Sequence, residues 1–163
     1  MILVTVGTNE APFDRLLQAF GTRPPGEELV VQHGPSRVRP PGARCVEFLP
    51  YQELADEIRR ARVVVTHAGV GSIMTALWNG KRPVVVPRLR RFGEAVDDHQ
   101  VALGRRLDES GLVTFVEDPD DVLRAVEDAG SAPGIELGPS PRLVEELRAF
   151  VAAHRRARVD GDG

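Results

Sequence analysis

Residues 63–100 read VVVTHAGVGSIMTALWNGKRPVVVPRLRRFGEAVDDHQ, and this stretch decides the fold. An apolar β-branched run ends at Thr66 and His67, a glycine turn follows, and a helix is predicted from about Ser72. A second apolar run at residues 83–86 predicts another buried strand. A strand, a turn, a helix and a second strand in this order are typical of an α/β protein.

The glycine turn at Gly69 and Gly71 favours an anion site. Glycines let the backbone come close to a ligand, and the start of a helix offers free N–H groups with a partial positive charge. The same turn also occurs in α/β proteins that bind nothing there. The glycines alone therefore leave both interpretations open.

The turn and the segments beyond it resemble the donor-binding signature of GT-B glycosyltransferases. The resemblance rests on the turn His67-Ala68-Gly69-Val70-Gly71-Ser72, the strand at residues 83–87 and the later Asp98-His99-Gln100. It implies that His67, Gly69, Val70, Gly71 and Ser72 hold a nucleotide diphosphate, with His67 as a diphosphate stabiliser, and that His99 and Gln100 read the sugar. The family usually has an acidic residue for the ribose eight positions past the His, where this chain has Thr75. Ribose recognition is therefore expected to be weaker, rearranged or supplied elsewhere.

Within GT-B, the chain resembles family 28 C-terminal domains. It is similar in particular to short chains related to the catalytic subunit of the two-subunit dolichol-linked N-acetylglucosamine transferase and to their bacterial exopolysaccharide counterparts. MILVTVGTNEAPFDRLLQAF at residues 1–20 and VEFLPYQEL at residues 46–54 extend the match, which covers roughly residues 1–126. The resemblance implies that the chain is the C-terminal half of a GT-B enzyme. It also implies an inverting transfer from a UDP-sugar to a polyprenyl-diphosphate-linked acceptor in polysaccharide or glycolipid synthesis. A membrane-anchored partner subunit is expected to bind that acceptor.

Several of these residues also have a purely structural interpretation. Gly7 and Thr8 either only turn the chain out of the first strand or contact the donor phosphate or the acceptor side, and His67 could simply cap a strand end. Arg88, with Arg90 and Arg91, forms a basic loop that is either solvated surface or a site for diphosphates or anionic lipid headgroups. The place of His67 before the glycine turn favours a diphosphate contact, and the resemblance raises the case for a contact by Gly7 and Thr8. Both interpretations of Arg88 stay open, and Gly7, Thr8, His67 and Arg88 are all kept as candidate donor-binding residues.

Strand-like and helix-like periods alternate along the chain. Strands are predicted at residues 2–6, 28–31, 44–48, 62–66, 83–86 and 112–116, with helices between them, one carrying Val96, Leu103 and Leu107. We expect a single Rossmann-like domain over residues 1–130, with a mainly parallel sheet and ligands at the carboxyl ends of its strands. Residues 131–141 predict a linker, and residues 142–163 a final amphipathic helix with a polar tail.

Composition narrows the function classes. With 163 residues, of which 42% are hydrophobic, the chain is long enough for one sizeable core and is expected to be half of a GT-B enzyme. Its net charge of -3 gives no reason to expect a nucleic-acid partner. No apolar run approaches the length of about 20 residues that spans a bilayer. The lone cysteine, Cys45, is expected to be a buried, inert thiol, which indicates a cytoplasmic protein. The family resemblance implies that a partner recruits it to the cytoplasmic face of the membrane.

The sequence contains no nucleophile elbow, Walker-type loop or metal-spaced Cys and His cluster, so we expect no metal and no cofactor beyond the UDP-sugar substrate. Direct displacement at a sugar carbon needs a base on the acceptor and stabilisation of the departing diphosphate. This chain is expected to supply the stabilisation, and its base is not identifiable. Two alternatives remain. One is a nucleotide-sugar-binding subunit that stabilises its partner without catalysis. The other is an unrelated nucleotide- or dinucleotide-dependent enzyme, which the lack of an acidic residue after a glycine fingerprint disfavours.

Overall fold

The structure is a computed structural model, and it describes residues 1–22 and 26–129. Six strands form one sheet in the order β3-β2-β1-β4-β5-β6, and every pairing is parallel. This order is that of a doubly wound Rossmann-like sheet and confirms the predicted fold class. The strands are β1 (Ile2–Thr5), β2 (Leu29–Gln32), β3 (Arg44–Val46), β4 (Val63–His67), β5 (Val84–Val86) and β6 (Thr114–Phe115).

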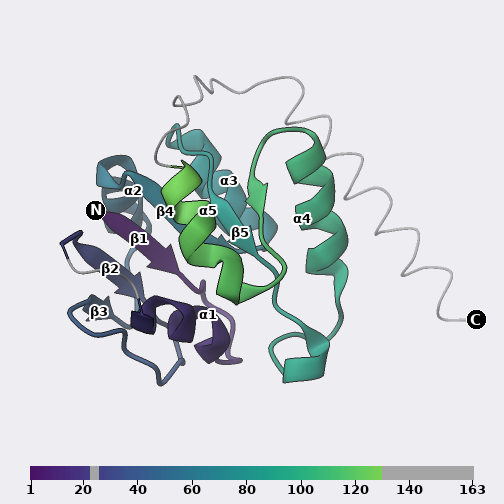
Figure 1. Cartoon of the computed structure of the whole chain (residues 1–163), viewed down its shortest axis with the longest axis horizontal. Helices are drawn as coiled ribbons and strands as arrows, with labels where there is room; N and C mark the ends of the chain where they lie inside the picture. The colour runs from purple at the N-terminus through teal and green to yellow at the C-terminus, as the bar shows by residue number, and fades with distance from the viewer. Residues whose placement is uncertain (23–25, 130–163) are drawn as a thin grey trace, which may run out of the picture.

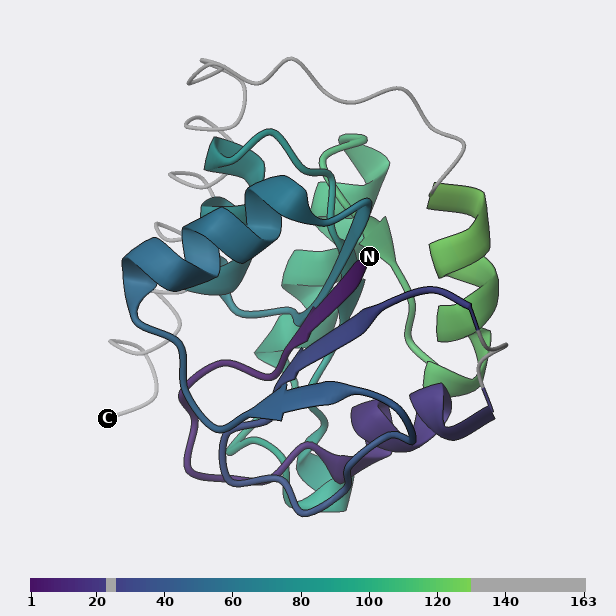
Figure 2. The ribbon, with the colours of Figure 1, turned by 90° about the vertical axis from the view of Figure 1, so that its left-hand side faces the viewer.

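Helices cover both faces of the sheet (Figures 1 and 2). Successive side chains of a strand point to opposite faces. Ile2 and Val4 therefore pack with α1 and α5, whereas Leu3 packs with α2 and α3. The helical segments are α1 (Asp14–Gln18), η1 (Ala19–Thr22), α2 (Tyr51–Arg60), α3 (Val70–Trp78), η2 (Arg90–Phe92), α4 (His99–Glu109), η3 (Pro119–Asp121) and α5 (Val122–Ala129). Because both faces are buried, the central strands β1 and β4 are apolar up to the polar residues at their carboxyl ends.

One predicted helix begins later than its apolar spacing suggested. The prediction placed Val96 on the apolar face of the helix with Leu103 and Leu107, but α4 begins at His99 and Val96 is 85% exposed. The carboxylate of Asp97 accepts the N–H of His99, and that of Asp98 accepts the N–H of Arg90. Both aspartates thus hold a non-helical turn before α4. Another helix, α3, begins earlier than predicted, at Val70 instead of Ser72.

Cys45 is only partly buried, so the expectation of a fully buried thiol was wrong. It lies on β3, which is an edge strand of the sheet with a neighbour on one side only. The predicted linker at residues 131–141 and the final helix within residues 142–163 lie outside the described residues. Within residues 1–22 and 26–129, no helix has the length and apolarity needed to cross a bilayer.

Candidate functional site

The carboxyl ends of β1 and β4 meet at one edge of the sheet, because the strands are parallel. A hollow of about 510 Å³ opens there, within the size range of small-molecule sites. We call it the carboxyl-edge pocket. Six predicted donor-binding residues line it: Gly7, Thr8, His67, Gly71, Ser72 and Thr75. The other lining residues are Thr5, Asn9, Gln32, Phe48, Leu49 and Leu54.

A buried polar network fixes the turn after β1. The hydroxyl of Thr5 donates to Gln32 Oε1 at 2.6 Å, and the N–H of Gly7 donates to the same oxygen at 3.2 Å. Gln32 Nε2 in turn donates to the carbonyls of Gly7 at 3.1 Å and Glu47 at 2.9 Å. Gly7 has a φ of +76°, which a side chain rarely tolerates. Thr5 and Gln32 were missed in the sequence, although each is a polar residue that ends an apolar strand.

The imidazole of His67 occupies a slot between two glycines. A Cβ atom on Gly7 would lie 2.4 Å from His67 Nε2, and one on Gly69 would lie 2.2 Å from His67 Cε1. Any side chain at either position would therefore clash with the imidazole ring, so both positions need glycine. Gly71 differs, because a Cβ there would meet nothing within 4 Å. Since Gly71 lines the pocket, that open space is available to a ligand.

His67 is neutral at pH 7. Burial, and secondarily the positive charge of Arg88, lower its pKa from 6.5 to about 4. Its Nε2 is hydrogen-bonded to the Ser72 hydroxyl at 2.8 Å, and its Nδ1 is buried with no partner in the described part of the chain. The ring therefore carries no charge at pH 7, and its hydrogen bond orients the Ser72 hydroxyl. A role for His67 as a diphosphate stabiliser stays a prediction.

The start of α3 forms one wall of the pocket. Its N-cap is Gly69, and no side chain caps it, so the first N–H groups of the helix are available to an anion. Val70 is the first helical residue, within the same turn. Thr75 lies one turn further on and lines the pocket, but its hydroxyl donates to the carbonyl of Gly71 at 2.8 Å. The position thus offers no carboxylate for a ribose.

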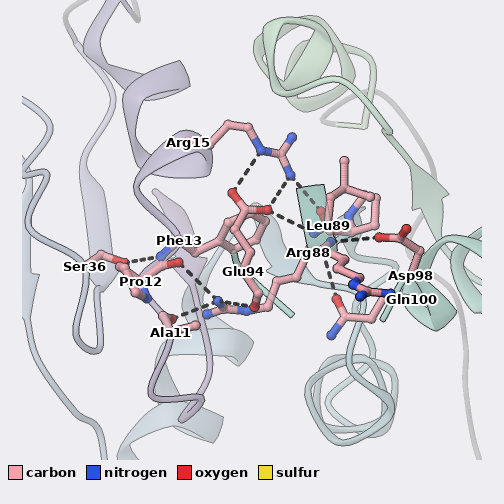
Figure 3. A network of polar contacts seen from close by, with 12 residues as sticks. Ala11, Pro12, Phe13, Arg15, Ser36, Arg88, Leu89, Glu94, Asp98 and Gln100 are labelled. Carbon is pink, nitrogen blue, oxygen red and sulfur yellow. Dashed lines mark hydrogen bonds and ion pairs between the residues drawn. The ribbon is translucent and has the colours of Figure 1, made fainter. Parts of the chain in front are cut away.

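The other predicted donor residues lie outside the pocket lining. Arg88 is fully buried, so it is not part of an exposed basic loop; its guanidinium bonds to backbone carbonyls (Figure 3). Gln100 is buried beside it and accepts the Arg88 N–H at 3.0 Å. His99 is exposed at the start of α4 and contacts Asp97. A donor contact by His99 or Gln100 stays a prediction.

A second hollow, of about 790 Å³, lies between α1–η1, η2 and the segment after β6. It contains none of the predicted donor residues, and its charged lining residues are the acids Glu117, Asp118 and Asp120 and the arginines Arg15 and Arg91. The carboxyl-edge pocket brings together six of the predicted donor residues and is therefore the better candidate despite its smaller volume. In the residues that the structure describes, no group of three or more His, Cys, Asp or Glu side chains is placed to hold a metal ion.

Comparison with solved structures supports the fold. The chain matches CalG4, the calicheamicin glycosyltransferase, with a TM-score of 0.57 and 20% identity over 91% of this chain and 37% of that one. It matches the glycosyltransferase of kitacinnamycin with a TM-score of 0.56 and 23% identity over 91% and 37% of the two chains. The six-stranded domain thus corresponds to the C-terminal half of GT-B glycosyltransferases, as predicted.

Sequence comparison gives the family. The UDP-N-acetylglucosamine transferase subunit ALG13 of Yarrowia lipolytica (strain CLIB 122 / E 150) is 32% identical over 106 residues, which are 61% of this chain and 52% of the relative. The chain thus spans about half of that relative's length. The model of the glycosyltransferase family 28 C-terminal domain matches residues 1–133, most of the chain, and the protein therefore belongs to that family.

Proposed function

We propose that this chain binds the sugar donor for an inverting glycosyltransferase that acts in polysaccharide or glycolipid synthesis. The donor is a UDP-sugar, and the acceptor is a sugar linked to a polyprenyl diphosphate at the cytoplasmic face of the membrane. A membrane-anchored subunit holds that acceptor. The observation that carries the proposal is the uncapped start of α3 in the wall of the carboxyl-edge pocket, where six predicted donor residues meet.

The pocket offers separate surfaces for the diphosphate and for the uracil ring of the donor. The N–H groups at the start of α3 and the Ser72 hydroxyl face the diphosphate. Phe48, which lines the pocket and is 62% exposed, offers a face on which a uracil ring can stack. His99 and Gln100 are assigned to the sugar through the family resemblance. Similarity to the Yarrowia relative, a UDP-N-acetylglucosamine transferase subunit, supports a UDP-sugar as the donor.

The chemistry assigned to this chain is stabilisation of the leaving group. As the bond between the sugar and the diphosphate breaks, negative charge grows on the diphosphate, and the dipole of α3 and the Ser72 hydroxyl stabilise it. Proton removal from the acceptor is assigned to the partner. No Asp or Glu lines the carboxyl-edge pocket, and the Nε2 of His67 is already bonded to Ser72.

A thermal-shift panel tests donor binding. UDP, a set of UDP-sugars and NAD are each added to the full chain, and at 100 times its dissociation constant a true ligand adds about 2.7 kcal/mol to the free energy of unfolding. We expect stabilisation by UDP and by one or a few UDP-sugars. Stabilisation by NAD alone would instead favour a dinucleotide-dependent enzyme.

A second candidate function is a nucleotide-sugar-binding subunit without catalysis. Thr75 favours it, because this residue stands where the family has its ribose-binding carboxylate and its hydroxyl bonds to its own helix. A single-turnover assay with a labelled UDP-sugar, the membrane subunit and the lipid-linked acceptor separates the two functions. Transfer of label to the acceptor supports the transferase. Tight donor binding without transfer supports the alternative.

A further inference from the structure

Arg88 connects segments that are far apart in the sequence. Its Nη2 donates to the carbonyl of Val6 at 2.9 Å, and its Nη1 donates to that of Ala11 at 2.9 Å (Figure 3). Longer bonds from Nη1 reach the carbonyls of Pro12 at 3.4 Å and Glu94 at 3.3 Å. The guanidinium thus joins the turn after β1 to the segment after β5, and none of the side chain is exposed to solvent.

Glu94 and Arg15 extend this contact. The buried carboxylate of Glu94 accepts Arg15 Nε at 3.0 Å, Arg15 Nη2 at 2.9 Å and the N–H of Leu89 at 3.0 Å. Arg15 Nη2 also donates to the carbonyl of Pro87 at 2.9 Å. The ring of Phe13 lies 4.7 Å from the Arg88 guanidinium carbon and 5.4 Å from that of Arg15. We call Arg88, Glu94, Arg15 and Phe13 the arginine brace.

One of the segments joined by the brace borders the carboxyl-edge pocket, and the other leads to the residues that the family resemblance assigns to the sugar. The turn after β1 carries Gly7, Thr8 and Asn9, which line the carboxyl-edge pocket. On the other side, the N–H of Arg88 donates to Gln100 Oε1. A backbone N–H can only donate, so the side-chain amide of Gln100 is held with its oxygen inward. The Arg88 guanidinium therefore bonds to Val6 and Ala11, on either side of the pocket-lining residues of this turn, and its backbone N–H bonds to the residue that the family resemblance assigns to the sugar.

We propose that Arg88 is a positioning residue that sets the spacing between the nucleotide-binding turn and the sugar-reading start of α4. This proposal rests on the proposed function. A planar guanidinium can bond to several carbonyls at once in a fixed geometry, which the single ammonium of a lysine cannot reproduce. The brace thus holds two loops that share no direct strand pairing, and it is expected to improve discrimination among sugars without itself contacting the donor.

The test compares Arg88→Met with a matched control, Arg82→Met. Methionine can still pack on Phe13 but donates no hydrogen bond. Arg82 also bonds to a backbone carbonyl, that of Val113 at 3.1 and 2.9 Å, but at the opposite edge of the sheet. Two quantities are measured for each variant: hydrogen exchange of the loop amides, and the ratio of the dissociation constants for UDP and for the preferred UDP-sugar.

For Arg88→Met we expect faster exchange at residues 7–13 and 89–94, where the N–H groups of Phe13 and Leu89 are bonded in the wild type. The preference for the UDP-sugar over UDP should fall about three- to tenfold, the range of one misplaced hydrogen bond. Arg82→Met should change neither quantity. A purely structural Arg88 would lower thermal stability and leave the affinity ratio unchanged, and that result would overturn the proposal.

Glu94→Gln provides a second variant if Arg88→Met does not fold. It keeps the shape of the side chain and weakens the contact with Arg15. Loop hydrogen exchange and the affinity ratio should therefore change in the same direction as in Arg88→Met, but by less. Unchanged loop exchange in this variant would also overturn the proposal. If the wild type binds no UDP-sugar at all, the proposed function fails, and the exchange experiment still decides whether the arginine brace holds the two loops together.

Discussion

The Nε2 atom of His67 lies 2.8 Å from the hydroxyl oxygen of Ser72, across the turn that joins β4 to α3. Because the pKa of His67 is held well below its ordinary value, the imidazole is neutral at pH 7. A neutral ring can orient the hydroxyl but adds no charge of its own. The backbone N–H groups and the dipole of α3 are therefore expected to supply most of the attraction for a diphosphate at this turn.

Stability is expected to depend on pH through His67. Its pKa is 6.5 in the unfolded chain and about 4 in the folded protein, so between these values the unfolded chain binds a proton that the folded protein does not. The free energy of unfolding should therefore fall as pH drops through this window, by about 1–3 kcal/mol in all. His67→Gln should remove this part of the dependence of the free energy of unfolding on pH, as measured by urea unfolding at pH 7 and pH 4.5. Equal slopes in the two proteins would contradict the prediction.

Glu27 should not disturb this comparison. A hydrogen bond from Arg62 lowers the pKa of Glu27 from 4.5 to about 2, against the opposing effect of burial. Its contribution to stability is therefore present above pH 4.5 and is lost only as pH falls toward 2. The difference between the wild type and His67→Gln above pH 4.5 consequently reports on the histidine.

The glycines of the site should respond differently to alanine. Gly69→Ala places a methyl group against the His67 ring and should destabilise the protein by about 1–3 kcal/mol, the usual cost of overpacking. Gly71→Ala meets no atom and lies in a helix, so it should be neutral or stabilising by up to about 1 kcal/mol. Denaturant unfolding measures both effects. In a His67→Ala background the cost of Gly69→Ala should largely disappear, because the ring is gone. Equal changes in the free energy of unfolding for Gly69→Ala and Gly71→Ala would contradict the placement of the His67 ring against Gly69.

Much of this site could be predicted from the sequence, because its residues follow directly after apolar strands. The ends of parallel strands fall at one edge, so His67 and Gly7 were placed near one another without knowledge of the contacts. The burial of Arg88 was not predictable in this way. It stands close to Arg90 and Arg91 in a run that looks like surface, and its partner carbonyl on Val6 lies 82 positions earlier in the chain.

The errors at Val96 and Cys45 have different causes, one local and one that depends on distant segments. Apolar spacing placed Val96 on a helix, but the carboxylates of Asp97 and Asp98 bond to nearby N–H groups and delay the start of α4. An apolar strand pattern suggested full burial of Cys45, but the pattern does not say which strand lies at the edge of the sheet. Strand order depends on contacts between distant segments, and β3 is an edge strand.

Nucleotide binding is expected to fail in Gly71→Val. The valine side chain would project into open space at the pocket wall and block the approach of a diphosphate to the start of α3. Gly21→Val is the matched control, since a Cβ there also meets nothing within 4 Å and Gly21 does not line the pocket. Calorimetric titration with UDP should show at least about a tenfold loss for Gly71→Val only, equivalent to about 1.4 kcal/mol. Wild-type affinity in a folded Gly71→Val protein would place the anion site elsewhere.

Thr75→Glu should strengthen UDP binding. The native hydroxyl donates to the carbonyl of Gly71 in its own helix. Replacing the threonine therefore removes one local hydrogen bond, at little cost in stability. A carboxylate at this pocket-lining position can accept hydrogen bonds from ribose hydroxyls, for a gain of about 0.5–1.5 kcal/mol, or somewhat more because the acceptor is charged. Thr75→Gln, of equal length but uncharged, separates the effect of charge from that of reach. Weaker binding by Thr75→Glu would show that the pocket excludes a carboxylate and recognises the ribose in another way.

The last prediction is that the chain alone binds its donor but transfers little or no sugar. The carboxyl-edge pocket contains no Asp or Glu, and its one imidazole has Nε2 bonded to Ser72 and Nδ1 buried, so neither nitrogen is placed to take a proton from an acceptor. A base from a second domain is therefore expected. In an assay with a labelled UDP-sugar and a lipid-linked acceptor, product should form only after addition of a membrane-associated subunit. Ser72→Ala in the complete complex should lower kcat, because the hydroxyl faces the departing diphosphate. Full transfer by the purified chain alone would contradict the assignment of the base to a partner.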